Sequence, residues 1–386
     1  MRVGIIGLGH RLGYLGYVFR AIDESFEIAG YVDPAPAGLA ELEAKGVSAG
    51  RQYASPAELI AGERLDLLMI GSPNHLHLDH IRIGLEAGLK VFCEKPIVTT
   101  IEDSLELAGL MGRHGHERLM VGLVLRYSPL YRDLRAAQGA GLLGDVVSIE
   151  ASEHIEPYHG AFFMRDWRRY ERYSGSFMLE KCCHDLDLYN GVAGARPERV
   201  ASFGGRKSFV PANDPAKEGV NDLELFYRKP SGWESTDKVF DSDADIIDYQ
   251  VAIVEYANGV GMNFHTNLNV PDQFRRFCVI GSRGMAEGDF VRGYLDVHRM
   301  LTGEKAVSNR YANETALSQH YGADEQMAAD IVAHLQQGVD LPVSTQDALE
   351  AGILALSMDE ARAKRSVVDL RPVWDRFDEA LLRRAA

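Results

Sequence analysis

The sequence predicts an α/β protein in which an N-terminal doubly wound parallel sheet is followed by an α+β domain with an open, mostly antiparallel sheet. In the first 125 residues, short β-branched apolar runs alternate with helical patterns, as is typical of a parallel sheet covered on both faces. A glycine-rich turn follows the first run, and strand-like segments dominate after residue 125. We therefore expect domains at 1–125 and 126–386, with the C-terminal helices free to pack back on the first domain.

The N-terminal strands are expected at 3–6, 28–32, 67–70, 91–93 and 119–125. Helices are expected from residue 10 to 22, after the capping residue Ser55, and over 77–87. Ligands of such sheets bind beyond the carboxyl ends of the strands. The loops that follow the third and fourth strands are therefore the informative ones.

The glycine turn has the chemistry of a dinucleotide-binding site. Gly7 permits a tight turn, Gly9 lets the backbone approach a pyrophosphate, and a helix that begins near His10 directs unpaired N–H groups at the phosphates. Asp33 ends the second strand, where a carboxylate can bind the ribose hydroxyls and repel a 2′-phosphate. The sequence therefore predicts a Rossmann domain that binds NAD rather than NADP, although the third glycine, Gly13, comes one residue late.

Composition narrows the possible partners. A formal net charge of −15 argues against nucleic acid and anionic membranes. No apolar stretch approaches the roughly twenty residues that a membrane span needs, and Met1 opens a strand, which leaves no room for a signal peptide. The four cysteines show no disulfide spacing. We therefore expect a cytoplasmic protein.

Four motifs occur in order along the chain. They are the glycine turn, S-P-N-x-x-H at 72–77, E-K-P at 94–96 and H-D-x-D at 184–187. This arrangement resembles the Gfo/Idh/MocA oxidoreductases, named for glucose-fructose oxidoreductase and inositol dehydrogenase, over nearly the whole chain. The resemblance implies a Rossmann domain and an α/β domain that together enclose a nicotinamide and a carbohydrate-like substrate, and an open sheet whose outer face often mediates oligomers.

NAD is the expected cofactor, and its binding residues are expected in the glycine turn, at the end of the second strand and in the later loops. They are Gly7, Leu8, Gly9, His10, Arg11, Leu12, Asp33, Ser72, Pro73, Asn74, His77, Glu94, Lys95, Pro96 and Arg126.

Lys95 is the first catalytic candidate. Because a proline follows it, its backbone is held extended, which fixes where the ammonium can point. A cation there can stabilise the developing alkoxide as hydride leaves, and a buried lysine could also transfer a proton itself. Glu94 is expected to orient Lys95 or the nicotinamide region. The alternative is an exposed turn lysine without chemistry.

Glu180 and His184 form the second catalytic candidate pair. Their i, i+4 spacing places both on one face of a helix, with Asp187 one turn further along. A carboxylate beside an imidazole raises the proton affinity of the imidazole, so His184 is the expected general base. Many relatives carry aspartate where this chain has Glu180, which leaves two roles open for Glu180, holding the substrate or orienting His184. A surface Glu–His pair without chemistry is the alternative.

Most substrate-binding candidates lie just upstream of this helix, where aromatic rings could stack on the C–H faces of a sugar. The full set is Lys95, Tyr158, His159, Phe163, Arg165, Trp167, Glu180, His184, His265 and His320. For His265 and His320 a structural role is equally compatible with the sequence.

Four arginines gather in the same segment, namely Arg165, Arg168, Arg169 and Arg172. They could bind an anionic group on the substrate. We favour the alternative, in which they pair with neighbouring carboxylates.

No metal is expected. The run Cys182-Cys183-His184 lies on a predicted helix, where consecutive side chains point about 100° apart, and no second Cys or His pair has ligand spacing.

The sequence predicts that the second domain is rich in strands. Strands are expected at 146–154, 199–209, 246–256, 259–267, 274–280 and 294–300, and helices at 323–336, 345–363 and 373–384. Asn258-Gly259 is a hairpin signal. The polar segment 211–245 is expected to be a long excursion, either a lid or an oligomer arm.

The sequence thus predicts an NAD-dependent dehydrogenase that oxidises a ring secondary alcohol of a sugar, glycoside or cyclitol such as inositol. Two alternatives stay open, an oxidoreductive glycosidase that recycles bound NAD and a non-catalytic sensor of NAD or sugar. The presence of both Lys95 and His184 argues against the sensor. The expected partners are a small carbohydrate or cyclitol and further copies of the chain in a dimer or tetramer, without nucleic acid or membrane.

Overall fold

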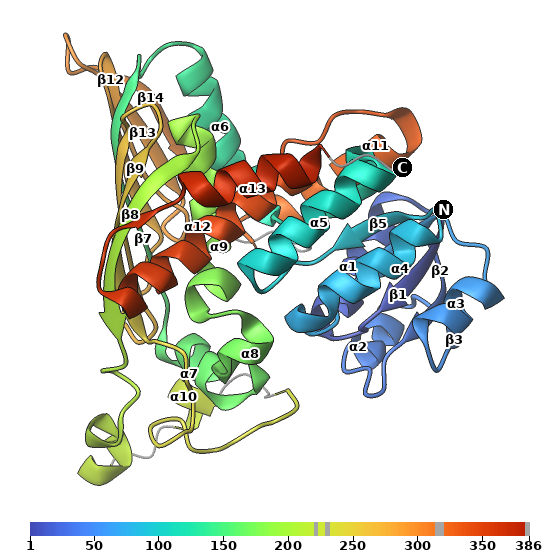
Figure 1. Ribbon diagram of the computed structural model, residues 1–386. Helices are drawn as coiled ribbons and strands as arrows, with labels where there is room; N and C mark the ends of the chain where they lie inside the picture. The colour runs from blue at the N-terminus through green and yellow to red at the C-terminus, as the bar shows by residue number, and fades with distance from the viewer. Residues whose placement is uncertain (220–222, 228–231, 313–319, 383–386) are drawn as a thin grey trace. The chain divides into compact units, whose positions relative to one another are not determined.

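The computed structural model describes residues 1–219, 223–227, 232–312 and 320–382, which form two compact units (Figure 1). The first unit is drawn from Met1–Ser128, Glu314–Gly352 and Val373–Ala386, and the second from Pro129–Asn313 and Ile353–Pro372. The functional domain bounds expected from the sequence, 1–125 and 126–386, stay a prediction.

The first unit contains a six-stranded sheet in which every pair of neighbours is parallel. Its spatial order is β3-β2-β1-β4-β5-β6, the doubly wound order of dinucleotide-binding folds. The strands are β1 (Arg2–Ile6), β2 (Glu27–Val32), β3 (Arg51–Gln52), β4 (Leu67–Ile70), β5 (Lys90–Cys93) and β6 (Leu119–Val121). The predicted parallel sheet is therefore confirmed.

Two helices of this unit, α3 (Pro56–Gly62) and α5 (Ile101–His114), begin at a side-chain cap. Ser55 accepts a hydrogen bond from Glu58 N at 3.2 Å and Thr100 accepts one from Asp103 N at 3.0 Å. The helices are α1 (His10–Ile22), α2 (Leu39–Ala44), α3 (Pro56–Gly62), η1 (Asn74–Leu76), α4 (His77–Glu86), α5 (Ile101–His114), η2 (His116–Arg118), η3 (Val124–Tyr127), α11 (Ala323–Gln337) and α13 (Arg371–Leu381). The last residues of the helix expected at 373–384 lie outside the described residues.

The strand expected at 119–125 is wrong in its second half. β6 ends at Val121, and a short 3-10 helix, η3, follows. The chain turns at Gly122, where Val124 N donates to the Gly122 carbonyl at 2.9 Å. A Cβ at Gly122 would lie 2.9 Å from Glu94 Oε2, so the backbone passes directly against that carboxylate.

The second unit contains a nine-stranded sheet in the order β14-β13-β12-β11-β7-β10-β9-β8-β15. β7 and β10 run parallel and the other pairs are antiparallel, which confirms the mostly antiparallel prediction. The strands are β7 (Val146–His154), β8 (Pro197–Gly205), β9 (Tyr249–Tyr256), β10 (Gly261–Asn267), β11 (Arg276–Gly281), β12 (Gly284–Asp289), β13 (Tyr294–Arg299), β14 (Lys305–Arg310) and β15 (Val368–Asp369). The sequence analysis missed β12, β14 and β15.

Two helices of the second unit, α6 (Pro129–Gly139) and α9 (Phe177–Ala193), lie on one face of this sheet (Figure 1). The unit also contains α7 (Pro157–Arg165), η4 (Trp167–Arg169), α8 (Glu171–Ser174), η5 (Pro211–Asn213), η6 (Pro215–Glu218) and α10 (Leu223–Tyr227). α12 (Thr345–Lys364) begins in the first unit and continues into the second. The hairpin at Asn258-Gly259 joins β9 and β10 with Gly259 at a φ of +85°.

The excursion expected at 211–245 exists, and parts of it (220–222 and 228–231) lie outside the described residues. Its described part packs on the segment before α9. Trp233 stacks on Trp167 with ring centroids 6.0 Å apart, and Thr236 N donates to the Arg165 carbonyl at 2.8 Å. A role as lid or oligomer arm stays a prediction.

Candidate active site

Two glycines of the glycine turn, Gly7 and Gly9, are required for different reasons. Gly7 has a φ of +84°, and a Cβ there would lie 2.3 Å from Ser72 N, so only glycine fits the turn. A Cβ at Gly9 would meet nothing within 4 Å. The space above Gly9 is therefore open to a ligand, as the phosphate-binding prediction requires.

A second close approach, between Gly13 and Gly38, explains the late glycine in the motif. Gly38 N donates to the Leu8 carbonyl at 2.9 Å, and a Cβ at Gly38 would lie 2.2 Å from Gly9 O. A Cβ at Gly13 would lie 2.6 Å from Gly38 O. The loop after β2 therefore packs directly on the glycine turn. This close packing requires glycine in the loop, at Gly38, and in the helix after the turn, at Gly13.

The first turn of α1 suits an anion. Its N-cap residue, Gly9, offers no side-chain cap and the first turn contains no acidic residue, so its N–H groups are available to phosphate. The side chains of Leu8 and Leu12 are buried, which leaves them only backbone groups to offer a cofactor, whereas His10 is exposed. Asp33 is half-buried at the end of β2. These residues fit NAD.

Arg11 and Glu94, both expected to bind cofactor, bind each other. Arg11 Nε lies 2.9 Å from Glu94 Oε1, and Arg11 Nη1 lies 2.7 Å from Asp324 Oδ1. Burial alone would lower the pKa of Arg11, but the Glu94 and Asp324 carboxylates more than offset it and raise that pKa. Glu94 Oε2 also accepts from Lys95 N at 3.2 Å. The cluster therefore ties the E-K-P loop to α1.

The sequence analysis missed Asp324, which is fully buried in the first turn of α11. Its Oδ2 lies 3.0 Å from His320 Nδ1. Burial would raise the pKa of Asp324, but Arg11 and His320 more than offset it and lower that pKa. His320, expected to bind substrate, is thus held beside the Arg11–Glu94 pair within the first unit.

His77 joins the two motif loops of the first unit. Its Nδ1 lies 2.8 Å from the Pro96 carbonyl and its Nε2 lies 2.8 Å from the Ser72 carbonyl. The ring is 1% exposed. His77 therefore acts on the loops that carry Pro73, Asn74 and Lys95 rather than offering its own side chain to a cofactor.

Lys95 is half-buried at the end of β5, and the Lys95–Pro96 peptide is cis. Arg126, expected to bind cofactor, is buried and directed at α12. Its Nη1 donates to the Pro342 carbonyl at 3.4 Å and its Nη2 lies 3.8 Å from Asp347 Oδ1.

The second unit contributes α9. Ser176 caps this helix by accepting a hydrogen bond from Leu179 N at 3.1 Å. Glu180 and His184 are 5% and 4% exposed, and Asp187 is buried one turn further along. Glu180 and His184 therefore do not lie on an exposed helix surface, and their part in the chemistry stays a prediction.

Glu180 has a cationic partner upstream. Arg168 Nε lies 3.4 Å from Glu180 Oε1, and Arg168 Nη1 lies 2.8 Å from Asp166 Oδ2. Asp166 is fully buried, and burial raises its pKa although Arg168 opposes the shift. Arg168 therefore lies between two carboxylates and holds Glu180 in place.

The other arginines of the cluster have internal contacts as well. Arg165 lies 4.6 Å over the Tyr227 ring, Arg169 Nε lies 2.7 Å from Asp243 Oδ1, and Arg172 lies 4.1 Å over the Tyr170 ring. Arg168 and Arg169 thus pair with carboxylates, as in the alternative that we favoured, whereas Arg165 and Arg172 lie over aromatic rings.

The aromatic candidates lie close to the start of α9. His159 stacks on Phe163 with ring centroids 5.6 Å apart, and Phe163 meets Phe177 edge-on at 5.2 Å. Tyr158 stacks on His159 at 6.0 Å. Trp167 is buried and stacks on Trp233.

His265 does not join this group. On β10 the side chain of Thr266 faces α9, where its Oγ1 lies 3.7 Å from Cys182 Sγ, so His265 points to the opposite face of the sheet. There His265 Nε2 and His154 Nδ1 both lie about 3 Å from Asn267 Nδ2. The structure therefore places His265 on the sheet face opposite α9, and its binding of substrate stays a prediction.

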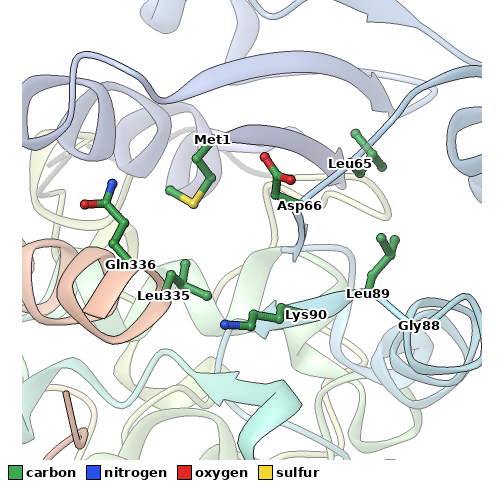
Figure 2. A pocket seen from close by; sticks show the side chains of 8 residues that line it. All are labelled: Met1, Leu65, Asp66, Gly88, Leu89, Lys90, Leu335 and Gln336. Carbon is green, nitrogen blue, oxygen red and sulfur yellow. The ribbon is translucent and has the colours of Figure 1, made fainter. Parts of the chain in front are cut away.

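A cavity of about 450 Å³ lies at the amino ends of β1, β4 and β5, beside the end of α11 (Figure 2). Its lining residues are Met1, Leu65, Asp66, Gly88, Leu89, Lys90, Leu335 and Gln336. The glycine turn and the E-K-P loop stand at the carboxyl ends of the same strands. This cavity therefore has no part in the candidate active site.

Within the described residues, no three His, Cys, Asp or Glu side chains gather as metal ligands would. None of the described helices combines the length and the apolar character that crossing a bilayer requires.

Comparison with known families adds independent information. Residues 1–123 match the model of an oxidoreductase family with an NAD-binding Rossmann fold, and residues 139–370 match the model of the C-terminal alpha/beta domain of the same family. The two matches together include residues of both units.

Individual relatives share a minority of residues. The oxidoreductase YteT of Bacillus subtilis is 24% identical over 302 residues, which are 68% of this chain and 70% of that protein. Inositol 2-dehydrogenase 3 of Saccharopolyspora erythraea is 30% identical over 247 residues, which are 61% and 69% of the two chains.

Two solved structures support the fold. Levoglucosan dehydrogenase in complex with NADH and levoglucosan has a TM-score of 0.74 at 18% identity and covers 96% of this chain and 98% of its own. A myo-inositol dehydrogenase from Corynebacterium glutamicum has a TM-score of 0.69 at 20% identity and covers 96% and 99%.

Proposed function

Because the chain belongs to the Gfo/Idh/MocA family of NAD-binding oxidoreductases, we propose that it oxidises a ring secondary alcohol of a sugar, glycoside or cyclitol. The observation that carries the proposal is the burial of Glu180 and His184 one turn apart on α9, in a chain that also contains Lys95 at the end of β5. A buried base and a positioned cation are what alcohol oxidation requires.

In this proposal His184 removes the hydroxyl proton while the C–H hydrogen leaves with its electron pair, so that the alcohol becomes a carbonyl. Bound NAD supplies the hydride acceptor. Lys95 stabilises the negative charge that develops on the oxygen. Glu180, held by Arg168 at 3.4 Å, accepts a hydrogen bond from a neighbouring hydroxyl and so fixes which carbon reacts.

The substrate class rests on the relatives and on the aromatic residues. An inositol 2-dehydrogenase is 30% identical to this chain over 247 residues. His159, Phe163 and Phe177 form a continuous row of rings close to Glu180 in the sequence, and rings of this kind stack on the C–H faces of cyclic polyols. Internal pairing of the arginine cluster favours a neutral substrate.

The test is a panel in which purified protein and NAD meet inositols, levoglucosan, neutral and anionic sugars, and glycosides. We expect NADH absorbance and an equimolar ketone with at least one neutral ring alcohol. His184→Asn serves as the matched variant and is expected to lose turnover while still binding NAD.

The panel also separates the alternatives. Aglycone release without net NADH would replace the dehydrogenase by the redox-cycling glycosidase. Binding of NAD and sugar without either product, in a protein whose His184→Asn variant behaves identically, would indicate the sensor.

We also propose that the protein is a cytoplasmic homo-oligomer in which the open face of the large sheet is covered by a second copy. Phe203, Val251 and Ile253 are 71%, 40% and 62% exposed on the neighbouring strands β8 and β9, and Ile280 on β11 is 42% exposed. Neighbouring exposed apolar side chains, such as those on β8 and β9, are typical of protein interfaces. Ile253→Lys is expected to reduce the mass measured by light scattering, and an unchanged mass would remove this face from the interface.

A further inference from the structure

Four charged side chains form a buried cluster beneath α9, outside the residues already assigned to the reaction. They are Glu153 on β7, Lys181 and Asp185 on α9, and Arg275 just before β11. Three of them are 4% exposed or less, and the side chain of Lys181 is 15% exposed. Their formal charges cancel, so the cluster can be buried as a whole.

The central contact is a two-pronged ion pair. Arg275 Nε donates to Asp185 Oδ1 at 2.7 Å and Arg275 Nη2 donates to Asp185 Oδ2 at 2.6 Å. Glu153 completes the cluster, with Oε2 2.7 Å from Arg275 Nε and Oε1 3.0 Å from Lys181 Nζ. Parallel bonds of this kind fix orientation as well as distance.

The sheet holds Arg275 firmly. Arg275 N donates to Asp289 Oδ1 at 3.2 Å, and the Arg275 carbonyl accepts from Phe290 N at 3.0 Å. Asp289 is fully buried and also accepts from Val291 N at 2.8 Å. The guanidinium therefore projects toward α9 from a backbone that is fixed on both sides.

The spacing of residues on α9 means that the Arg275–Asp185 ion pair also determines where Glu180 and His184 lie. Lys181 and Asp185 form one i, i+4 stripe, and Glu180 and His184 form a second stripe one residue earlier. The two stripes run parallel to each other, about 100° apart around the helix axis. Any rotation or sliding of α9 that moved Glu180 and His184 would have to break the Arg275–Asp185 pair.

We propose that Arg275, through Asp185, is a positioning residue that fixes the rotation and axial position of α9 and so orients Glu180 and His184 for hydride transfer. The inference rests on the proposed function for its catalytic meaning. The anchoring of α9 itself does not depend on that function. Burial raises the pKa of Asp185 to about 6 although Arg275 opposes the shift, so loss of Arg275 would leave Asp185 still harder to ionise.

The test compares two double variants that each remove one buried positive and one buried negative charge. Arg275→Met/Asp185→Asn removes the two-pronged pair. Lys181→Met/Glu153→Gln is the matched control, because it leaves that pair intact. We expect the first variant to lower kcat by about 100-fold, as misplaced reacting groups do, with the KM for NAD unchanged, and the second to stay within about threefold of the native kcat.

Two further measurements make the result specific. Arg275→Lys keeps the charge but loses the two-pronged geometry, so its kcat should also fall, whereas a residue needed only for charge balance would tolerate the exchange. A substrate deuterated at the reacting carbon should show a larger kinetic isotope effect in the Arg275 variants, because the chemical step becomes slower.

Hydrogen exchange of the α9 amides tests the anchoring without any turnover. We expect faster exchange in Arg275→Met/Asp185→Asn than in the control. Native kcat in a folded Arg275→Met/Asp185→Asn variant, or equal losses in both double variants, would overturn the inference. If the native protein oxidised no alcohol, the proposed function would fail, and the exchange rates would still decide whether Arg275 anchors α9.

Discussion

The two units hold their reactive side chains in different ways. In the first, Lys95 and the glycine turn stand on loops. The His77 side chain contacts the Ser72 and Pro96 carbonyls and so fixes the loop of Lys95, and Gly7 N donates to the Val32 carbonyl at 2.9 Å. In the second, Glu180 and His184 stand inside a helix that buried charges attach to a sheet. Loops at strand ends depend on glycine and local hydrogen bonds, whereas a helix depends on distant ion pairs.

The largest expected effect tests whether the two units act on one reaction. His184→Asn and Lys95→Met should each lower kcat by about 100-fold or more, because each removes a group that we propose to act on the reacting oxygen. Steady-state kinetics on the best substrate of the panel will measure both. Full turnover in either variant would remove that unit from the chemistry.

A pair of glycine variants tests the loop anchoring of the first unit. Gly7→Ala should lower the free energy of unfolding by about 3 kcal/mol, because it combines a positive φ with a backbone clash. Gly9→Ala should leave stability nearly unchanged and weaken NAD binding, since its Cβ would project into open space. Urea unfolding and NAD titration separate the two, and equal stability losses would contradict the assigned tasks.

His77→Phe should loosen both motif loops at once. It removes the ring contacts to two buried carbonyl oxygens, so we expect a loss of about 2 kcal/mol in stability and a higher KM for NAD. His80→Gln, which removes only the contact of His80 Nδ1 with Ser72 Oγ at 2.9 Å, is the matched control. A KM for NAD that rises equally in both variants would argue against a bridging role of His77.

The smallest effect concerns pH, and it is expected in both units. Burial lowers the pKa of His80 in the first unit and of His154 in the second to about 4. Because the unfolded chain binds these protons near pH 6.5, each histidine should destabilise the fold by about 1 to 2 kcal/mol as the pH falls toward 4. In urea unfolding at about pH 7 and about pH 5, His80→Gln should weaken this dependence. The exposed His116→Gln should not, and equal slopes would contradict the assignment.

The sequence predicts the local features of the site well. These features are recognisable within a few residues of sequence. They are the glycines at 7 and 9, the strand that leads to Asp33 and the spacing of Glu180 and His184. The structure contains the turn, the strand and the helix that carry them. The alternation of residues along a strand could also have predicted which sheet face His265 occupies. Met262, Phe264 and Thr266 alternate with it along β10, and this apolar alternation marks His265 as facing the other side of the sheet.

Contacts between distant parts of the chain could not be predicted in this way. Asp324 binds Arg11 across 313 residues and Arg275 binds Asp185 across 90 residues. Nothing near Asp324 or Arg275 in the sequence distinguishes them from surface charges, because their burial follows from the packing of other elements. The residues that position a reactive group are therefore harder to predict than the group itself.

The contact of Gly38 with the glycine turn limits how the cofactor preference of this protein can be redesigned. A change of preference to NADP would require a loop after Asp33 that offers an arginine to the 2′-phosphate. Here that loop ends at Gly38, which lies against the Gly9 carbonyl and against Gly13. A donor loop without glycine at this position would push the phosphate-binding turn out of shape, so a successful graft must keep Gly38 or change the turn together with it.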